Sequence, residues 1–139
     1  MKLTDINETL EATNREVEFM PRNKPTTWFF ELRHESSPEV QEFNRVFQAK
    51  VRNLAFKNKA QQRDALIAKQ ANGLRIAHVA GWRYEEGDDE EGGRPKFSKQ
   101  ELKSVLDGGS GEWLAFHVGE FIDNEVGSLE DFLERSENS

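Results

Sequence analysis

The chain has 139 residues, of which 35% are hydrophobic and 32% charged, and it contains no cysteine. This length fits one domain with a modest core, and the lack of cysteine excludes disulfide scaffolds, Cys-ligated zinc sites and thiol catalysis. No apolar run reaches the ~18 residues that span a membrane, and no signal-peptide core opens the chain, so we expect a cytoplasmic protein that does not enter a membrane.

Charge is divided into three stretches along the chain. Residues 1–42 carry a net charge of −4, residues 43–83 carry +8 with Asp64 as their single acid, and residues 84–139 carry −11. Opposite charges on one chain predict that it pairs with itself, either within one molecule or between copies. The alternative interpretation is a basic helix surface that is only solvated.

The first predicted elements are a short helix and a β-hairpin. Leu3, Ile6 and Leu10 recur at helical spacing. Residues 16–19 then alternate polar and apolar, and residues 26–33 are β-branched and aromatic, which is typical of strands. The turn-rich residues 21–25 between them predict a five-residue connection.

Two long helices are predicted next. Either Ser37 caps the first helix with Pro38 at its first position, or Ser36 and Glu39 form a capping box. Its apolar stripe consists of Val40, Phe43, Phe47, Val51 and Leu54. The Ala-rich composition of residues 60–80 favours a second helix, although residues 74–82 also fit a strand.

An acidic loop at 84–95 separates these helices from a C-terminal helical part. Six carboxylates fall within residues 85–91, and we expect such a loop to be solvated. Ser98 and Glu101 form a capping box that opens a short helix ending near Leu106, and Phe97 is placed to pack on Leu102.

Two further helices complete the predicted chain. One begins near residue 110 and ends by Gly127, and Ser128 with Asp131 starts a last short one. The expected fold is mainly α within the α+β class, formed by a single domain over residues 1–139. We divide it into a hairpin region at 1–35, a basic helical segment at 36–83, an acidic loop at 84–95 and a C-terminal helical segment at 96–135.

The usual catalytic patterns are missing from the sequence. His34, His78 and His117 lie far apart without metal-ligand spacing, and no phosphate-binding loop or nucleophile elbow is present. The acidic loop does not fit an EF-hand, because counting from Asp88 puts Lys99 where a bidentate acid is required. We therefore expect no enzyme, no cofactor and no metal site.

Nucleic-acid binding is a weaker alternative that the basic segment raises. Four of its basic residues, at 45, 52, 59 and 63, fall roughly on one side of a helix. The whole chain is nevertheless acidic, with a pI of about 5.1, and it has no helix-turn-helix or RNP pattern. We do not expect it to bind nucleic acid.

Aromatic and basic side chains are the candidates for partner binding. Trp28 and Phe29 are adjacent in a strand, so one of them points away from a single-sided core. An exposed aromatic surface in so polar a chain is typical of a partner site. The candidate residues are Trp28, Phe29, Phe43, Arg45, Phe47, Arg52, Trp82, Trp113, Phe116 and Phe121.

The order of these features resembles the tail assembly chaperones of bacteriophages with long, non-contractile tails. The resemblance spans about residues 26–133 and depends on short motifs in a fixed order. These are Thr27-Trp28-Phe29, Leu32-Arg33-His34, Ser36-Ser37-Pro38, the basic helix, Ile76-Ala77-His78-Val79-Ala80 before Gly81-Trp82, the acidic loop, Pro95-Lys96-Phe97-Ser98 with Leu102 and Leu106, and finally Phe121, Asn124 and Phe132. The six acids of the loop depart from the family pattern and leave the loop's role open.

The resemblance implies a helical, self-associating assembly factor without enzymatic activity. Such proteins bind the tape measure protein, keep it soluble, help recruit tail tube protein, act in the host cell cytoplasm and are absent from the mature virion. Two alternatives remain open: a virion structural component, such as a head–tail connector or tail completion protein, and an acidic inhibitor that mimics DNA.

Overall fold

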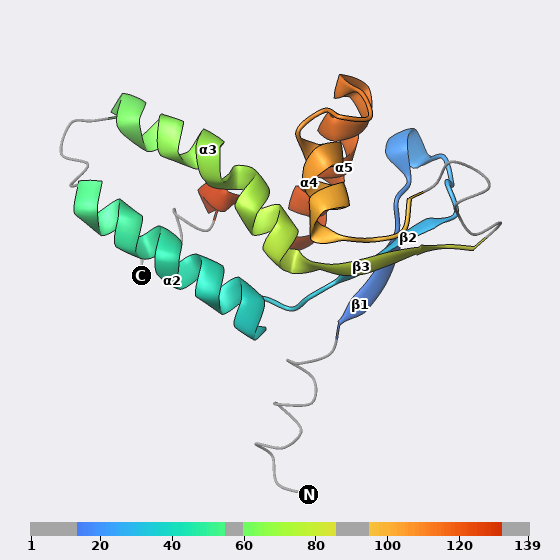
Figure 1. Cartoon of the computed structure of the whole chain (residues 1–139), viewed down its shortest axis with the longest axis horizontal. Helices are drawn as coiled ribbons and strands as arrows, with labels where there is room; N and C mark the ends of the chain where they lie inside the picture. Colours follow the sequence, from blue (N-terminus) through green and yellow to red (C-terminus); the bar gives the residue numbers. More distant parts are fainter. Residues whose placement is uncertain (1–13, 55–59, 86–94, 132–139) are drawn as a thin grey trace, which may run out of the picture.

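The structure, a computed structural model, describes residues 14–54, 60–85 and 95–131 (Figure 1). The elements follow in the order β1 (Arg15–Glu18), β2 (Trp28–Leu32), α2 (Pro38–Leu54), α3 (Ala60–His78), β3 (Val79–Tyr84), α4 (Lys99–Leu106) and α5 (Glu112–Val126). This order confirms the predicted α+β fold, mainly helical, with an N-terminal hairpin. The helix predicted at residues 3–10 and residues 86–94 of the acidic loop lie outside the described residues.

The three strands form an antiparallel sheet in the order β1-β2-β3, so β2 lies in the middle. Trp28 pairs with Tyr84 and Phe30 pairs with Trp82, which puts these four rings on one face of the sheet. Helices α4 and α5 cover that face (Figure 1). Phe29 lies on the opposite face, as the alternation of a strand requires.

The hairpin connection is longer than its sequence predicted. Strand β1 ends at Glu18 and β2 begins at Trp28, with a 3₁₀ turn at Pro21–Asn23 between them. The hydroxyl of Thr26 donates to the carbonyl of Phe19 at 2.6 Å, and the Phe19 N–H donates to the Trp28 carbonyl at 2.8 Å. These two bonds hold the ends of the connecting loop together, directly after β1 ends and before β2 begins.

Helix α3 passes directly into β3 without a connecting loop. His78 is the last helical residue and Val79 is the first of the strand. The predicted helix over 60–80 is therefore two residues too long, and the strand alternative is right for the part after His78. Arg33 stabilises the junction, because its Nη1 donates to the carbonyls of Ala77 and Val79, both at 3.0 Å.

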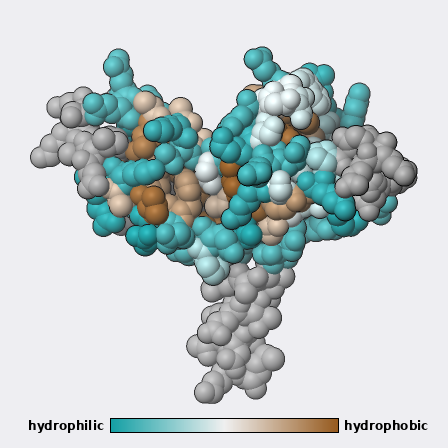
Figure 2. Space-filling model, viewed as in Figure 1, coloured by the Kyte–Doolittle hydropathy of each residue, from teal (hydrophilic) through white to brown (hydrophobic). Residues whose placement is uncertain are grey.

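Two hydrophobic clusters hold the described part of the chain together. The first lies between the sheet and helices α4 and α5 and contains Phe19, Phe30, Leu32, Val79, Leu102, Val105, Leu106, Val118 and Ile122. The second lies in the α2–α3 hairpin and contains Val40, Phe47, Leu74 and Leu129. Figure 2 shows hydrophobic residues reaching the surface over this hairpin. Leu129 follows α5 and packs in this second cluster, so the C-terminal end of the described chain connects the α2–α3 hairpin to α5.

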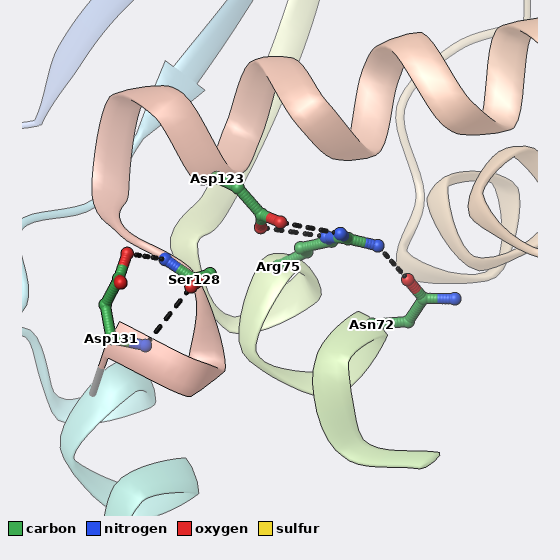
Figure 3. Close-up of polar contacts among 5 residues, drawn as sticks. All are labelled: Asn72, Arg75, Asp123, Ser128 and Asp131. Carbon is green, nitrogen blue, oxygen red and sulfur yellow. Dashed lines mark hydrogen bonds and ion pairs between the residues drawn. The ribbon is translucent and has the colours of Figure 1, made fainter. Parts of the chain in front are cut away.

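Side-chain caps open the last two helical segments, as predicted. The Ser98 hydroxyl accepts from the N–H of Glu101 at 3.0 Å at the start of α4. Ser128 and Asp131 bond each other's N–H groups, both at 3.2 Å, and residues 129–131 are helical (Figure 3). At α2, Pro38 is the first helical residue, but the Ser37 hydroxyl is buried and bonds nothing in the described part of the chain.

Candidate partner-binding surfaces

The outer side of α5 carries exposed aromatic side chains. Trp113 is 53% exposed and Phe116 is 63% exposed, whereas Val118 and Ile122 on the inner side are fully buried. The imidazole of His117 lies between the two rings, with centroid distances of 4.2 Å to Trp113 and 5.3 Å to Phe116. These three side chains, at the helical spacing i, i+3 and i+4, form one aromatic patch.

A groove of 430 Å³ separates this side of α5 from α3. It is lined by Ala68, Ala71, Asn72, Arg75, Leu106, Ala115, Phe116, Glu120 and Asp123. Figure 2 shows the molecule hollowed between α3 on one side and α4 and α5 on the other. The three alanines leave room for another chain to approach the backbone of both helices, and Phe116 forms an apolar wall.

Two of the residues that line the groove, Arg75 of α3 and Asp123 of α5, form an ion pair between the helices (Figure 3). Arg75 donates to both carboxylate oxygens of Asp123, at 2.9 Å and 2.7 Å, and to the side-chain oxygen of Asn72 at 2.8 Å. Both charged side chains are less than a quarter exposed. This ion pair joins the basic middle of the chain to its acidic end within one molecule. It is one instance of the predicted pairing of opposite charges within the chain.

A second hollow, of 330 Å³, lies between the end of the sheet and the α4–α5 connection. Its lining consists of Thr26, Trp28, Trp82, Tyr84, Pro95, Val105, Ser110 and Leu114. We call it the aromatic pocket. Trp28 meets Trp82 edge to face at a centroid distance of 5.2 Å and stacks with Tyr84 at 5.8 Å. The Trp28 Nε1 is buried and has no acceptor among the residues described.

Both ends of the acidic loop are attached at the aromatic pocket. The carbonyl of Pro95 accepts from Trp82 Nε1 at 3.0 Å and from the Tyr84 hydroxyl at 3.1 Å. At the other end, the N–H of Glu85 donates to the carbonyl of Thr27 at 2.9 Å. These bonds fix the polar tips of Trp82 and Tyr84.

The structure distributes the other predicted site residues over the core and the surface. Phe47 is only 1% exposed, and Phe43 is half-buried and stacks on it, so both belong mainly to the hairpin core. Phe121 is half-buried and packs its ring on Phe19 and Phe30. The structure therefore brings together Trp28 with Trp82, and Trp113 with Phe116, but not these two pairs with each other.

The predicted basic residues of α2 are exposed. Arg45 bonds both carboxylate oxygens of Glu42, one turn away, and this contact lowers the pKa of Glu42. Arg52 donates to the carbonyl of Gln48 at 3.4 Å. Neither arginine is among the residues that line the groove or the aromatic pocket.

Phe29 lies on the outer face of the sheet under a charged side chain. The Arg83 guanidinium stands 4.5 Å from the centre of the Phe29 ring and bonds Glu16 at 2.8 Å and 2.6 Å. The hydrogen bond from Arg83 lowers the pKa of Glu16. This local ion pair covers Phe29, so Phe29 is a weaker candidate for partner contact than Phe116.

Sequence reasoning did not single out several residues of these surfaces. Tyr84 falls in the predicted acidic loop, and Leu114 lies in the helix predicted to begin near residue 110 without a role of its own. Ala68 and Ala71 belong to the Ala-rich stretch that predicts the second long helix, and their i, i+3 spacing places two small side chains on one side of α3. Arg75 counted only as one charge of the basic segment.

Within residues 14–54, 60–85 and 95–131, no group of three or more His, Asp or Glu side chains is placed to hold a metal ion. None of the helices in those ranges is long and apolar enough to cross a membrane. Comparisons with protein-family models, with curated proteins and with solved structures found no match.

Proposed function

We propose that this chain is a bacteriophage tail assembly chaperone, which binds the tape measure protein, keeps it soluble and helps recruit tail tube subunits. The observation that supports the proposal best is the exposed Phe116 beside the groove between α3 and α5. An amphipathic partner helix binds such a groove by placing apolar anchors along one of its sides. The sequence resemblance supplies the identity of the partner.

The composition of the groove suits a helical client. Helix axes pack 8–10 Å apart only where the side chains at the contact permit it, and Ala68, Ala71 and Ala115 are small enough to do so. Phe116 then provides apolar area in the lining of the groove. The net charge of −7 keeps the resulting complex soluble while apolar segments of the client are covered.

Self-association and location are part of the proposal. Copies of the chain coat one long client in the host cytoplasm and leave before the virion is complete. Lys50 and Arg52 of α2 are exposed, as are Glu112 and Glu120 of α5, so opposite charges are available on separate surfaces of each copy. Contacts between copies add to client binding through repeated attachment along the same polymer.

Co-expression with the tape measure protein tests the groove. Phe116→Ser is expected to reduce the amount of soluble tape measure protein and its recovery with the chaperone, because it removes the apolar wall. Val46→Ser is the matched control, since Val46 is 38% exposed on α2, away from the groove. Unchanged client solubility with folded Phe116→Ser protein would contradict the proposed binding surface.

Purified virions test the assembly role independently. A chaperone is expected to be missing from finished particles, whereas a connector or tail completion protein is present at a fixed copy number. Quantitative mass spectrometry of purified particles separates these outcomes. Stoichiometric recovery in the particles would favour the virion-component alternative over the chaperone.

A further inference from the structure

The aromatic pocket contains a buried donor that lacks an acceptor. The indole Nε1 of Trp28 is closed to solvent and bonds nothing among the residues described. The other two aromatic side chains of the lining differ, because Trp82 Nε1 and the Tyr84 hydroxyl both donate to the Pro95 carbonyl, at 3.0 Å and 3.1 Å. Buried polar groups are nearly always hydrogen-bonded, so the Trp28 N–H indicates an acceptor that the described part of the chain does not supply.

The other residues of the lining favour a neutral acceptor. All eight lining residues are uncharged, and the two aliphatic ones, Val105 and Leu114, come from α4 and α5, which cover this face of the sheet. A carboxylate would lose its hydration here with no cationic side chain in the lining, whereas a carbonyl oxygen loses far less. The Trp28 N–H therefore matches an uncharged group that carries a carbonyl oxygen.

Pro95 shows which kind of carbonyl this wall binds. It lines the pocket, and its main-chain carbonyl accepts from the indole N–H of Trp82 and the hydroxyl of Tyr84. Trp28 lies on the neighbouring strand, and its ring meets Trp82 edge to face at 5.2 Å, so a second indole donor stands in the same cluster of rings. This donor is suited to a second main-chain carbonyl.

The rings and the size of the pocket suit a proline residue at this place. Extended segments with proline bind aromatic-lined grooves, and proline has no N–H that burial would leave without a partner. Its fixed φ angle also lowers the entropy lost when the segment is held. The volume of 330 Å³ is at the lower end of the range for ligand pockets, about 300–1,000 Å³, which suits one ring with its flanking main chain.

We propose that the aromatic pocket binds a proline residue in an extended segment of a partner protein, and that a main-chain carbonyl of this segment accepts from Trp28 Nε1. The N–H is closed to water in the structure, so the indole has to turn as the segment enters. The pocket shares no lining residue with the groove of the proposed function. The inference therefore stands whether or not the chain is a tail assembly chaperone.

Proton–nitrogen NMR of the full ¹⁵N-labelled chain measures the donor directly. The chain has three tryptophans and therefore three indole N–H signals, and Trp82→Phe and Trp113→Phe each remove one, which assigns the third to Trp28. The probes are blocked glycine–serine heptapeptides with one central proline, alanine or leucine. We expect the proline peptide to move the Trp28 proton signal downfield in a saturable way, because the N–H gains an acceptor.

The three peptides and a small amide separate the possible occupants. Alanine lacks two of the ring carbons of proline, and we expect its peptide to bind roughly tenfold more weakly. Equal binding of the leucine peptide would overturn the assignment to proline. N-acetylproline methylamide that binds as tightly as the proline peptide would assign the pocket to small amides and overturn the protein partner. A Trp28 signal that stays in place while the Trp82 signal shifts would overturn the hydrogen bond, and no shift of either signal would overturn the site.

A pair of matched substitutions provides a second measurement. Trp28→Phe keeps a ring in the pocket but removes the N–H, and we expect it to weaken binding of the proline peptide several-fold, with the Trp82 signal as the reporter. Trp113→Phe makes the same exchange at a side chain that is 53% exposed outside the pocket, and the affinity should not change. Thermal unfolding shows whether each variant is folded. Equal weakening in both would contradict the assignment, and if Trp28→Phe does not fold, the Trp28 signal of the unsubstituted chain decides.

Discussion

The guanidinium of Arg75 lies so close to Gly119 that a side chain at position 119 would have to displace it. A Cβ atom on Gly119 would stand 2.9 Å from Arg75 Nη1 and 3.0 Å from Cζ. Gly119 is buried on the inner side of α5, one turn before Asp123. The glycine therefore lets the arginine pass along α5 and reach its carboxylate partner.

We expect Gly119→Ala to destabilise the protein although alanine favours helices. The added methyl group would displace the guanidinium and weaken its bonds to Asp123 and Asn72, each worth about 1 kcal/mol. Urea unfolding measures the change. Gly81→Ala is the control, because a Cβ there would lie 3.6 Å from a Glu31 oxygen, an ordinary contact. A Gly119→Ala protein as stable as wild type would show that Arg75 repositions freely.

The Ser98 cap should contribute measurably to stability. Ser98→Ala leaves the Glu101 N–H without its acceptor and is expected to cost about 1 kcal/mol. Ser104→Ala, at an exposed position inside α4, should cost nothing, since alanine is the better helix former there. Equal unfolding midpoints for the two variants would argue against the cap.

His78 is expected to make stability depend on pH. The side chain is buried, and this burial lowers the pKa of His78 below 6.5; nearby Arg33 and His34 act in the same direction, whereas the hydrogen bond to the Leu74 carbonyl and the charge of Glu35 oppose it. The two pKa values that matter are the lowered one of His78 in the folded protein and the ordinary one of about 6.5 in the unfolded chain. At a pH between them, the unfolded chain binds a proton on His78 that the folded chain does not. Stability is therefore full above about pH 6.5 and falls as the pH falls below it.

Unfolding at about pH 7.5 and about pH 5.5, on either side of the ordinary histidine pKa, tests this expectation. His78→Gln should reduce the difference in unfolding midpoint between the two conditions. A rise in wild-type stability on acidification would contradict the direction of the pKa shift.

Self-association should weaken as salt is added. The basic segment 43–80 of one copy is expected to meet the acidic segment 112–134 of another, with apolar contacts from Phe116 supplying most of the affinity. Light scattering at about 50 mM and about 500 mM salt measures this, because the screening length shortens well below 10 Å over that range. A monomer in both conditions would contradict self-association, and the same oligomer in both would remove its electrostatic basis.

Helix starts could be predicted from the sequence because a cap is a local arrangement. Ser98 and Glu101, or Ser128 and Asp131, are only three residues apart, so no distant contact is needed to form the bond. The end of α3 is different. Residues Leu74 to Trp82 suit helix or strand, and the choice depends on pairing with β2 and on Arg33, which lies more than forty residues earlier in the chain.

Exposure on α5 could not be predicted for a related reason. Apolar side chains occur on most sides of this helix, so periodicity does not say which of them faces the core. Packing decides that Ile122 is buried and Phe116 is exposed. In α2 the stripe was clear, and Phe47 would have been better assigned to the core than to a partner surface.

Because α3 passes directly into β3, the end of the helix influences which side chains of β3 point to each face of the sheet. The register of β3 already skips one residue next to this junction, because Glu31 pairs with Gly81 and Leu32 pairs with Val79, which leaves Ala80 as the extra residue. With this irregularity kept in place, one residue inserted between His78 and Val79 would move Trp82 into the place of Arg83, on the outer face. Arg75, which lines the groove, and Trp82, which lines the aromatic pocket, are therefore coupled through the length of the chain between them. A homologous chain that retains both surfaces must keep that number of residues or change the irregular pairing at Ala80 to compensate.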